Sequence, residues 1–123
     1  MTTAPAIQIK RVYEPAEDSD GRRILVDRLW PRGLSKEVAR IDYWARDIAP
    51  SNELRRWYQH DPDKWAEFRL RYAVELGGMA EGVAQLRAQL RAGIVTFLYS
   101  SKEQQLNNAV ALKAYLEGED GGE

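Results

Sequence analysis

Side chains that can bind anions or move protons follow an apolar run in the first third of the chain. Residues 23–29 carry apolar groups on both faces of an extended chain, which predicts an interior strand. Asp27 and Arg28 come near its end, and Arg32 follows in a loop. Guanidinium groups match phosphate and carboxylate in shape and charge. Because ligands bind at the carboxyl ends of strands in open α/β sheets, this loop is the predicted working surface.

A second polar group follows the other apolar β-run, residues 94–99. Ser101 and Gln104 match a capping box, so the last helix is predicted to begin there and to offer free N–H groups to an anion. If the two strands are parallel, their exits lie side by side at one edge of the sheet. The predicted anion-binding cleft contains Arg28, Arg32, Ser100, Ser101 and Lys102. The alternative is that Ser101 is only a cap and the basic side chains pair with local acids.

Asp27 and Tyr99 are the candidate catalytic residues, one at the end of each interior strand. A partly desolvated carboxylate can act as acid or base, and a tyrosine at the corresponding position can donate a proton. The structural alternatives are an ion pair of Asp27 that fixes the loop and a packing role for Tyr99. The leading hypothesis is a protein that binds an anionic or phosphorylated small molecule, with catalysis as an open alternative.

Trp30 lies among arginines on the same loop and is a candidate aromatic contact for a nucleobase. Residues 22–40 contain six basic and two acidic side chains, so the second hypothesis is a nucleic-acid or protein-interaction module, and a third is a surface that joins identical subunits. The whole chain has 18 basic and 19 acidic residues and a net charge of -1. Any attraction for anions must therefore be local.

The residue types of the chain restrict the metal sites and cofactors that it could contain. Cysteine is absent and His60 is the only histidine, which excludes thiolate sites and a multi-histidine metal site within one chain. His60 precedes Asp61 and Pro62, a pattern typical of the start of a helix. Acidic residues such as Glu53 and Asp63 could contribute to a magnesium site, but no spacing requires one. We expect no metal, and no motif indicates a cofactor.

The pattern as a whole predicts an α/β fold, with a small, mainly parallel sheet of three to four strands and helices on both faces. Residues 1–123 are predicted to form a single domain, with 6–117 as the folded core and 118–123 as a loose tail. No apolar run reaches the roughly 20 residues needed to span a bilayer. With no leader-like start, we expect a soluble cytoplasmic protein without a membrane partner.

The local patterns predict each element in turn. Residues 7–12 begin with an apolar and polar alternation typical of an edge strand, and 41–45 predict a brief strand. Ser35 is a cap for a short helix over 36–39. Longer helices are predicted over 51–58, 61–76, 79–92 and 101–116, where apolar residues recur every three or four positions.

Several motifs together resemble the YeaO-like branch of a domain-of-unknown-function family. They are Val26 to Ser35; Asp47 to Ser51 with Leu54, Arg55 and Trp57; His60 to Pro62 with Trp65 and Phe68; and Thr96 to Tyr99 with Lys102, Asn107 and Asn108. The resemblance covers residues 7–116 and implies a compact α/β domain without an established activity. In wider relatives a cysteine stands at the position of Tyr99, and a Cys-His-Arg triplet lies near residues 107–109. Neither is present here, so the resemblance implies no thiol chemistry for this chain.

Overall fold

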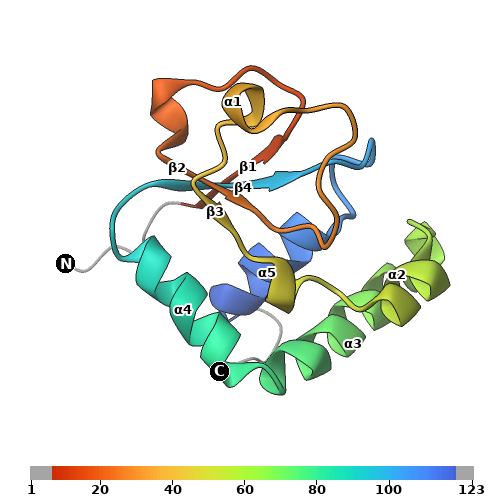
Figure 1. Cartoon of the computed structure of the whole chain (residues 1–123). Helices are drawn as coiled ribbons and strands as arrows, with labels where there is room; N and C mark the ends of the chain where they lie inside the picture. Colours follow the sequence, from red (N-terminus) through yellow and green to blue (C-terminus); the bar gives the residue numbers. More distant parts are fainter. Residues whose placement is uncertain (1–6, 119–123) are drawn as a thin grey trace.

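A four-stranded parallel sheet forms the centre of the molecule. The computed structural model describes residues 7–118, and in this part of the chain the strand order is β1-β4-β2-β3. The strands are β1 (Ile7–Arg11), β2 (Arg22–Leu25), β3 (Tyr43–Trp44) and β4 (Val95–Tyr99) (Figure 1). Every pairing is parallel, and β1 is an edge strand. The structure therefore confirms the α/β class and the parallel pairing of the two interior strands.

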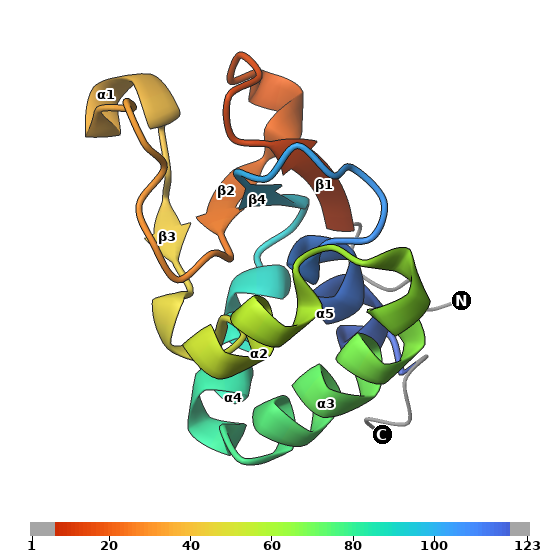
Figure 2. The ribbon, with the colours of Figure 1, turned by 90° about the vertical axis from the view of Figure 1, so that its right-hand side faces the viewer.

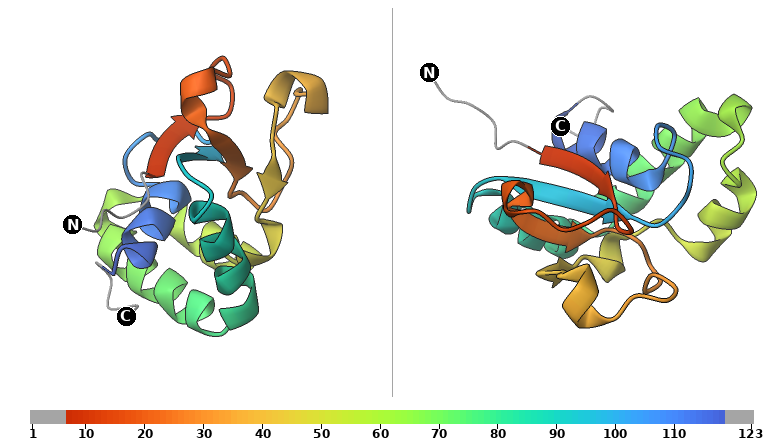
Figure 3. Two further views of the ribbon diagram at one scale, coloured as in Figure 1. Left: turned by 90° about the vertical axis from the view of Figure 1, so that its left-hand side faces the viewer. Right: turned by 90° about the horizontal axis from the view of Figure 1, so that it is seen from above.

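Helices cover the two faces of the sheet unequally. The helices are α1 (Lys36–Ala39), α2 (Asn52–Tyr58), α3 (Trp65–Gly77), α4 (Ala80–Leu90) and α5 (Asn108–Leu116), with short 3-10 turns at Asp18–Asp20 (η1), Arg46–Ile48 (η2) and Pro62–Lys64 (η3). Figure 2 and Figure 3 show α2 to α5 on one face, and the single turn of α1 with η1 on the other. None of the helices in the described part of the chain has the length and apolar character needed to cross a membrane.

The alternation of side chains along β2 divides the core into two clusters. Ile24 and Val26 pack in the larger cluster, whose other members come mainly from β4 and from helices α2 to α5. Leu25 points the other way and packs with Leu98 and Val12 in a smaller cluster. Ile24, Leu25 and Val26 are fully buried, because an interior strand of a parallel sheet is covered on both faces.

The strand is shorter than its apolar pattern predicts. Strand β2 ends at Leu25, and Leu29, which was predicted to lie in it, is 59% exposed. The last backbone hydrogen bond from this segment to β4 is donated by the Val26 N–H to the Leu98 carbonyl. Beyond it, the side chains of Asp27 and Arg28 bond to groups outside the strand, and the chain leaves the sheet.

The predicted start of the last helix is wrong. Helix α5 begins at Asn108 and not after Ser101, because Asn107 provides the cap by accepting a hydrogen bond from Val110 N at 3.0 Å. The Glu103 carboxylate holds the preceding loop by accepting hydrogen bonds from Leu106 N and Gln105 N, which lower its pKa. The exit of β4 is therefore an irregular loop, and Ser101 does not lie at a helix N-terminus.

The starts of α1, α2 and η3 agree with the cap signals in the sequence. Ser51 Oγ accepts from Leu54 N at the start of α2, and Asp61 accepts from Asp63 N before η3, which continues into α3. Ser35 caps α1 in the same way. The predicted tail at 118–123 lies outside the described residues except for Gly118, so the loose tail stays a prediction.

Candidate functional site

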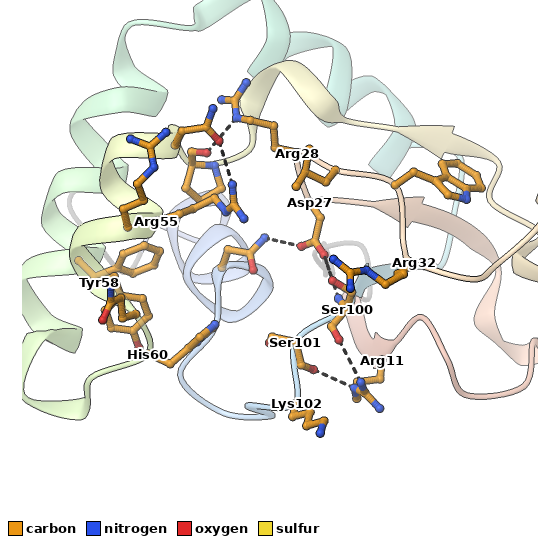
Figure 4. A pocket seen from close by; sticks show the side chains of 18 of the residues that line it. Arg11, Asp27, Arg28, Arg32, Arg55, Tyr58, His60, Ser100, Ser101 and Lys102 are labelled. Carbon is orange, nitrogen blue, oxygen red and sulfur yellow. Dashed lines mark hydrogen bonds between the residues drawn. The ribbon is translucent and has the colours of Figure 1, made fainter.

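A cavity of about 1140 Å³ opens at the carboxyl ends of β2 and β4 (Figure 4). Six basic side chains line it: Arg11, Arg28, Arg32, Arg55, Arg56 and Lys102. Among its described lining residues Asp27 is the single acid. We call this cavity the basic cleft. Its charge contrasts with the net charge of -1 of the whole chain, so the positive potential is local to this edge of the sheet.

The two strand exits meet at the basic cleft. The parallel pairing of β2 with β4 brings the loop after β2 next to the loop after β4, and the predicted residues of both loops line one cavity. The members brought together are Arg28, Arg32, Ser100, Ser101 and Lys102. The adjacency inferred from two interior strands is therefore present in the structure.

Asp27 joins the two strand exits. Its Oδ2 accepts hydrogen bonds from the backbone N–H and the hydroxyl of Ser100, at 2.9 and 2.8 Å. Its Oδ1 accepts one from Asn108 Nδ2 at 3.0 Å. These neutral donors take the place of the loop-fixing ion pair that the sequence suggested for Asp27. Both carboxylate oxygens are engaged in holding β2, β4 and α5 together.

Arg28 bonds to backbone carbonyls of the loop before α2. Its Nε donates to Pro50 O at 3.2 Å and its Nη2 donates to Ala49 O at 3.0 Å. Ser51, the next residue, is held by both oxygens of Glu75 on α3. Because carbonyl oxygens carry no net charge, Arg28 is fixed in place while its positive charge remains in the basic cleft.

Arg11 is a site residue that sequence analysis missed. It lies at the end of β1, where its Nε donates to Ser101 O at 2.8 Å and its Nη2 donates to Ser100 O at 3.0 Å. Its guanidinium also lies 5.0 Å from the centre of the Tyr13 ring, and the Tyr13 hydroxyl donates to Arg32 O. The signal in the sequence was a basic residue at the end of the predicted edge strand, which pairs with β4.

Arg55 and Arg56 on α2 were also missed. Leu54 and Tyr58 of this helix are buried, which turns the two arginines outward. The Tyr58 hydroxyl donates to Leu106 O at 2.6 Å and ties α2 to the loop after β4. Burial, with the nearby charges of Glu103 and Asp61, raises the pKa of Tyr58 to about 12. Two consecutive arginines on a short amphipathic helix were the signal in the sequence.

Tyr99 is not brought to the basic cleft. It belongs to the larger core cluster and is 3% exposed. Burial, followed by the charge of Glu14, raises the pKa of its hydroxyl. His60 does line the cleft, just beyond the end of α2, with its ring centre 5.4 Å from that of Tyr58. Its φ of 57° places it in the left-handed region, directly after Gln59 at 48°.

Trp30 lines the edge of the cleft but is held by the protein. Its Nε1 donates to Leu34 O at 2.7 Å. Its ring packs edge-on against Trp44, with 5.5 Å between the ring centres. The basic segment 22–40 does not form one surface. Arg23 is buried beside Asp20, and Arg22 bonds to Gln89 away from the cleft. The nucleic-acid and oligomer hypotheses stay predictions.

No acidic cluster that could hold a metal ion is present in residues 7–118. Groups of three or more histidine, aspartate or glutamate side chains with the necessary arrangement do not occur there. Glu53 and Asp63, considered from the sequence as contributors to a magnesium site, are absent from the lining of the basic cleft, which contains Asp27 and His60.

Comparison with known proteins shows that the chain is similar to bacterial proteins that are named as uncharacterised. A family model described as "Inactive DUF488-N3 subclade" matches residues 6–121. The protein YeaO of Escherichia coli K12, named as uncharacterised, is 44% identical over 110 residues, covering 89% of this chain and 96% of YeaO. An uncharacterised protein of Mycobacterium tuberculosis H37Rv is 38% identical over 118 residues, covering 96% of this chain and 99% of that protein. No solved structure matches significantly.

Proposed function

The chain belongs to the inactive DUF488-N3 subclade, and we propose that it is a binding protein for a small anionic or phosphorylated molecule held in the basic cleft. One observation carries the proposal. Six basic side chains line a single cavity whose only described acid, Asp27, already accepts three hydrogen bonds from protein donors. Such a cavity favours an anion because multiple arginines supply charge-assisted hydrogen bonds to phosphate or carboxylate oxygens.

Binding is favoured over catalysis by the state of the two candidate catalytic residues. Asp27 uses both of its oxygens to connect β2, β4 and α5, so we assign it to the scaffold of the cleft. Tyr99 is buried in the core on the helical face of the sheet. The description of the family as inactive supports the same choice.

Titration calorimetry of the full chain with inorganic phosphate, pyrophosphate and a panel of phosphorylated metabolites tests the proposal. Arg28→Ala and Arg32→Ala should each weaken binding of the best ligand by about 10- to 100-fold, the loss expected for hydrogen bonds to a charged group. Arg91→Ala is the matched control, because Arg91 is exposed and lies outside the cleft. An absence of binding across the panel, or equal affinity in all four proteins, would contradict the proposal.

A short single-stranded oligonucleotide separates this proposal from the nucleic-acid hypothesis. A surface that follows a phosphate backbone loses affinity steeply with salt, whereas an enclosed small-ligand site depends on salt far less. We expect weak binding of the strand and clear binding of the small anion at physiological salt. Strand binding with a steep salt slope and no small-anion binding would favour the alternative.

A further inference from the structure

Two arginines of the basic cleft are anchored by the same arrangement of hydrogen bonds. Arg11 uses Nε and Nη2 on the consecutive carbonyls of Ser101 and Ser100, and Arg28 uses Nε and Nη2 on those of Pro50 and Ala49. Within residues 7–118 neither Nη1 group donates to a protein acceptor. Each arginine therefore presents a charged donor whose position is fixed before any ligand arrives, which lowers the entropy cost of binding.

The two anchored arginines belong to different walls of the cleft. Arg11 is fixed to the loop after β4, which also carries Lys102, and its Tyr13 neighbour is bonded to the backbone of Arg32. We call Arg11, Arg32 and Lys102 the strand-side group. This wall is built by β1, β4 and the loop after β2.

The second wall is built by α2 and the loop before it. Arg28 is fixed to that loop at Ala49 and Pro50, and α2 begins two residues later. Arg55 and Arg56 project from this helix, and Arg55 donates to Asn52 Oδ1 at 2.8 Å. We call Arg28, Arg55 and Arg56 the helix-side group.

Asp27 lies between members of the two groups. In Figure 4 it lies between Arg28 and Arg55 on one side and Arg11 and Lys102 on the other. Its carboxylate is fixed there by Ser100 and Asn108. A negative charge in the middle of the cleft disfavours an anionic group at that point, while an uncharged polar linker can lie across it.

The size of the cleft also exceeds what one small anion needs. Ligand pockets of about 300–1,000 Å³ hold molecules of drug size. The basic cleft, at about 1140 Å³, is as large as such a pocket. A single phosphate would contact one group of bases and leave the other group without an anion.

From these observations we infer that the cleft recognises a small molecule with two separate anionic groups joined by an uncharged linker, such as a bisphosphate. The inference rests on the proposed function and names the ligand class of the same site. One anionic group contacts the strand-side group, and the other contacts the helix-side group. Linking the two contacts in one molecule makes the second contact intramolecular, which strengthens binding without new protein groups.

Calorimetry with matched probes tests this inference. Alkane bisphosphates of increasing chain length are compared with the corresponding alkyl monophosphates. We expect one bisphosphate length to bind with one molecule per chain and roughly 100-fold more tightly than its monophosphate, the low end of the gain from linked contacts. Equal affinities for every pair would overturn the inference while leaving anion binding intact. If neither class of probe binds, the proposed function itself fails.

Variants of each wall provide the second arm. The double variants Arg32→Ala with Lys102→Ala, and Arg55→Ala with Arg56→Ala, each remove two exposed bases from one group and leave the anchored arginine in place. Each double variant should reduce the advantage of the bisphosphate to less than tenfold, whereas Arg91→Ala should preserve it. Thermal unfolding of each variant confirms that it is folded. If one double variant abolishes the advantage and the other leaves it unchanged, one wall binds both anionic groups and the inference is wrong.

Discussion

Arginines in two regions of this sheet are anchored alike, but only one region pairs its arginine with a carboxylate. On the face covered by α1 and η1, Arg23 donates to the carbonyls of Ala39 and Arg40 and also to Asp20 Oδ2 at 2.6 Å. At the carboxyl end of the sheet, the acceptors of Arg11 and Arg28 within residues 7–118 are all backbone carbonyls. The presence or absence of one carboxylate therefore separates a structural arginine from one that is available to a ligand.

The compensated region is a neutral network, which we call the ion-paired cluster: Lys10, Glu17, Asp20 and Arg23. Asp20 and Arg23 are each 4% exposed. Burial would raise the pKa of Asp20, but hydrogen bonds from Glu17 N, Lys10 and Arg23 outweigh it and lower the pKa. Burial likewise opposes the charge of Lys10, yet Glu17 and Asp20 raise its pKa overall. Charge in this cluster is used to hold η1 and α1 against the strands.

Among residues 7–118, the bases of the basic cleft form no such ion pairs. Mutual repulsion among its bases costs stability, and a bound anion removes that cost. The difference between the two regions leads to four predictions about stability, which range from a large loss to almost none.

Asp20→Ala should cause the largest loss of stability, about 3–5 kcal/mol, because it leaves Arg23 buried without its carboxylate partner. Chemical denaturation of the variant and the wild type measures this loss. A loss below about 1 kcal/mol would contradict the assignment of the cluster as a buried ionic network.

Arg28→Ala should destabilise the protein by about 1–3 kcal/mol, because the carbonyls of Ala49 and Pro50 lose their donors. Unlike Asp20→Ala, it should also weaken anion binding, so the two variants separate stability from ligand affinity. The measurement is denaturation with and without saturating phosphate. Stability equal to the wild type would show that the anchoring of Arg28 contributes little.

Acid should weaken the ion-paired cluster. The folded pKa of Asp20 lies below its ordinary value of 3.8, so its contribution is present above about pH 4 and is lost as the pH falls through the folded pKa. Asp20→Asn should flatten this part of the stability profile, as measured by denaturation at a series of pH values below pH 5. Identical slopes for the two proteins would rule out a contribution from Asp20.

Arg32→Ala should change stability least, by no more than about 0.5 kcal/mol, because the side chain is exposed and its loss relieves repulsion within the cleft. The melting temperature without ligand measures this effect. A marked loss of stability would indicate that Arg32 has a structural role, and the contrast with the ion-paired cluster would then fail.

The sequence predicts the sheet well because each interior strand carries a local signal. Ile24, Leu25 and Val26 place apolar side chains on both faces of the chain and identify one strand. The apolar run before Tyr99 identifies the other strand, and parallel pairing brings the carboxyl ends of the two strands together. The same reasoning overextends β2 to Leu29. An apolar side chain gives no indication that Asp27 will bond across the sheet edge and end the ladder.

The place of Arg11 in the basic cleft depends on contacts between segments that are far apart in the sequence. Arg11 lies about 90 positions before the carbonyls that hold it, and no local pattern couples them. The start of α5 was misplaced because two polar caps compete in a short loop, where Asn107 caps the helix and the Ser101 hydroxyl bonds to Glu103 O. Serine and asparagine are both favourable N-cap residues by local propensity, and tertiary packing decides that Asn107 caps the helix.

A crystal structure with tungstate or selenate, heavy-atom analogues of phosphate and sulfate, tests the central claim most directly. Because these anions scatter anomalously, their positions can be assigned without ambiguity. The account predicts anomalous peaks in the basic cleft within hydrogen-bonding distance of the Nη1 groups of Arg11 and Arg28. Peaks elsewhere on the surface, with none in the cleft at saturating concentration, would contradict it.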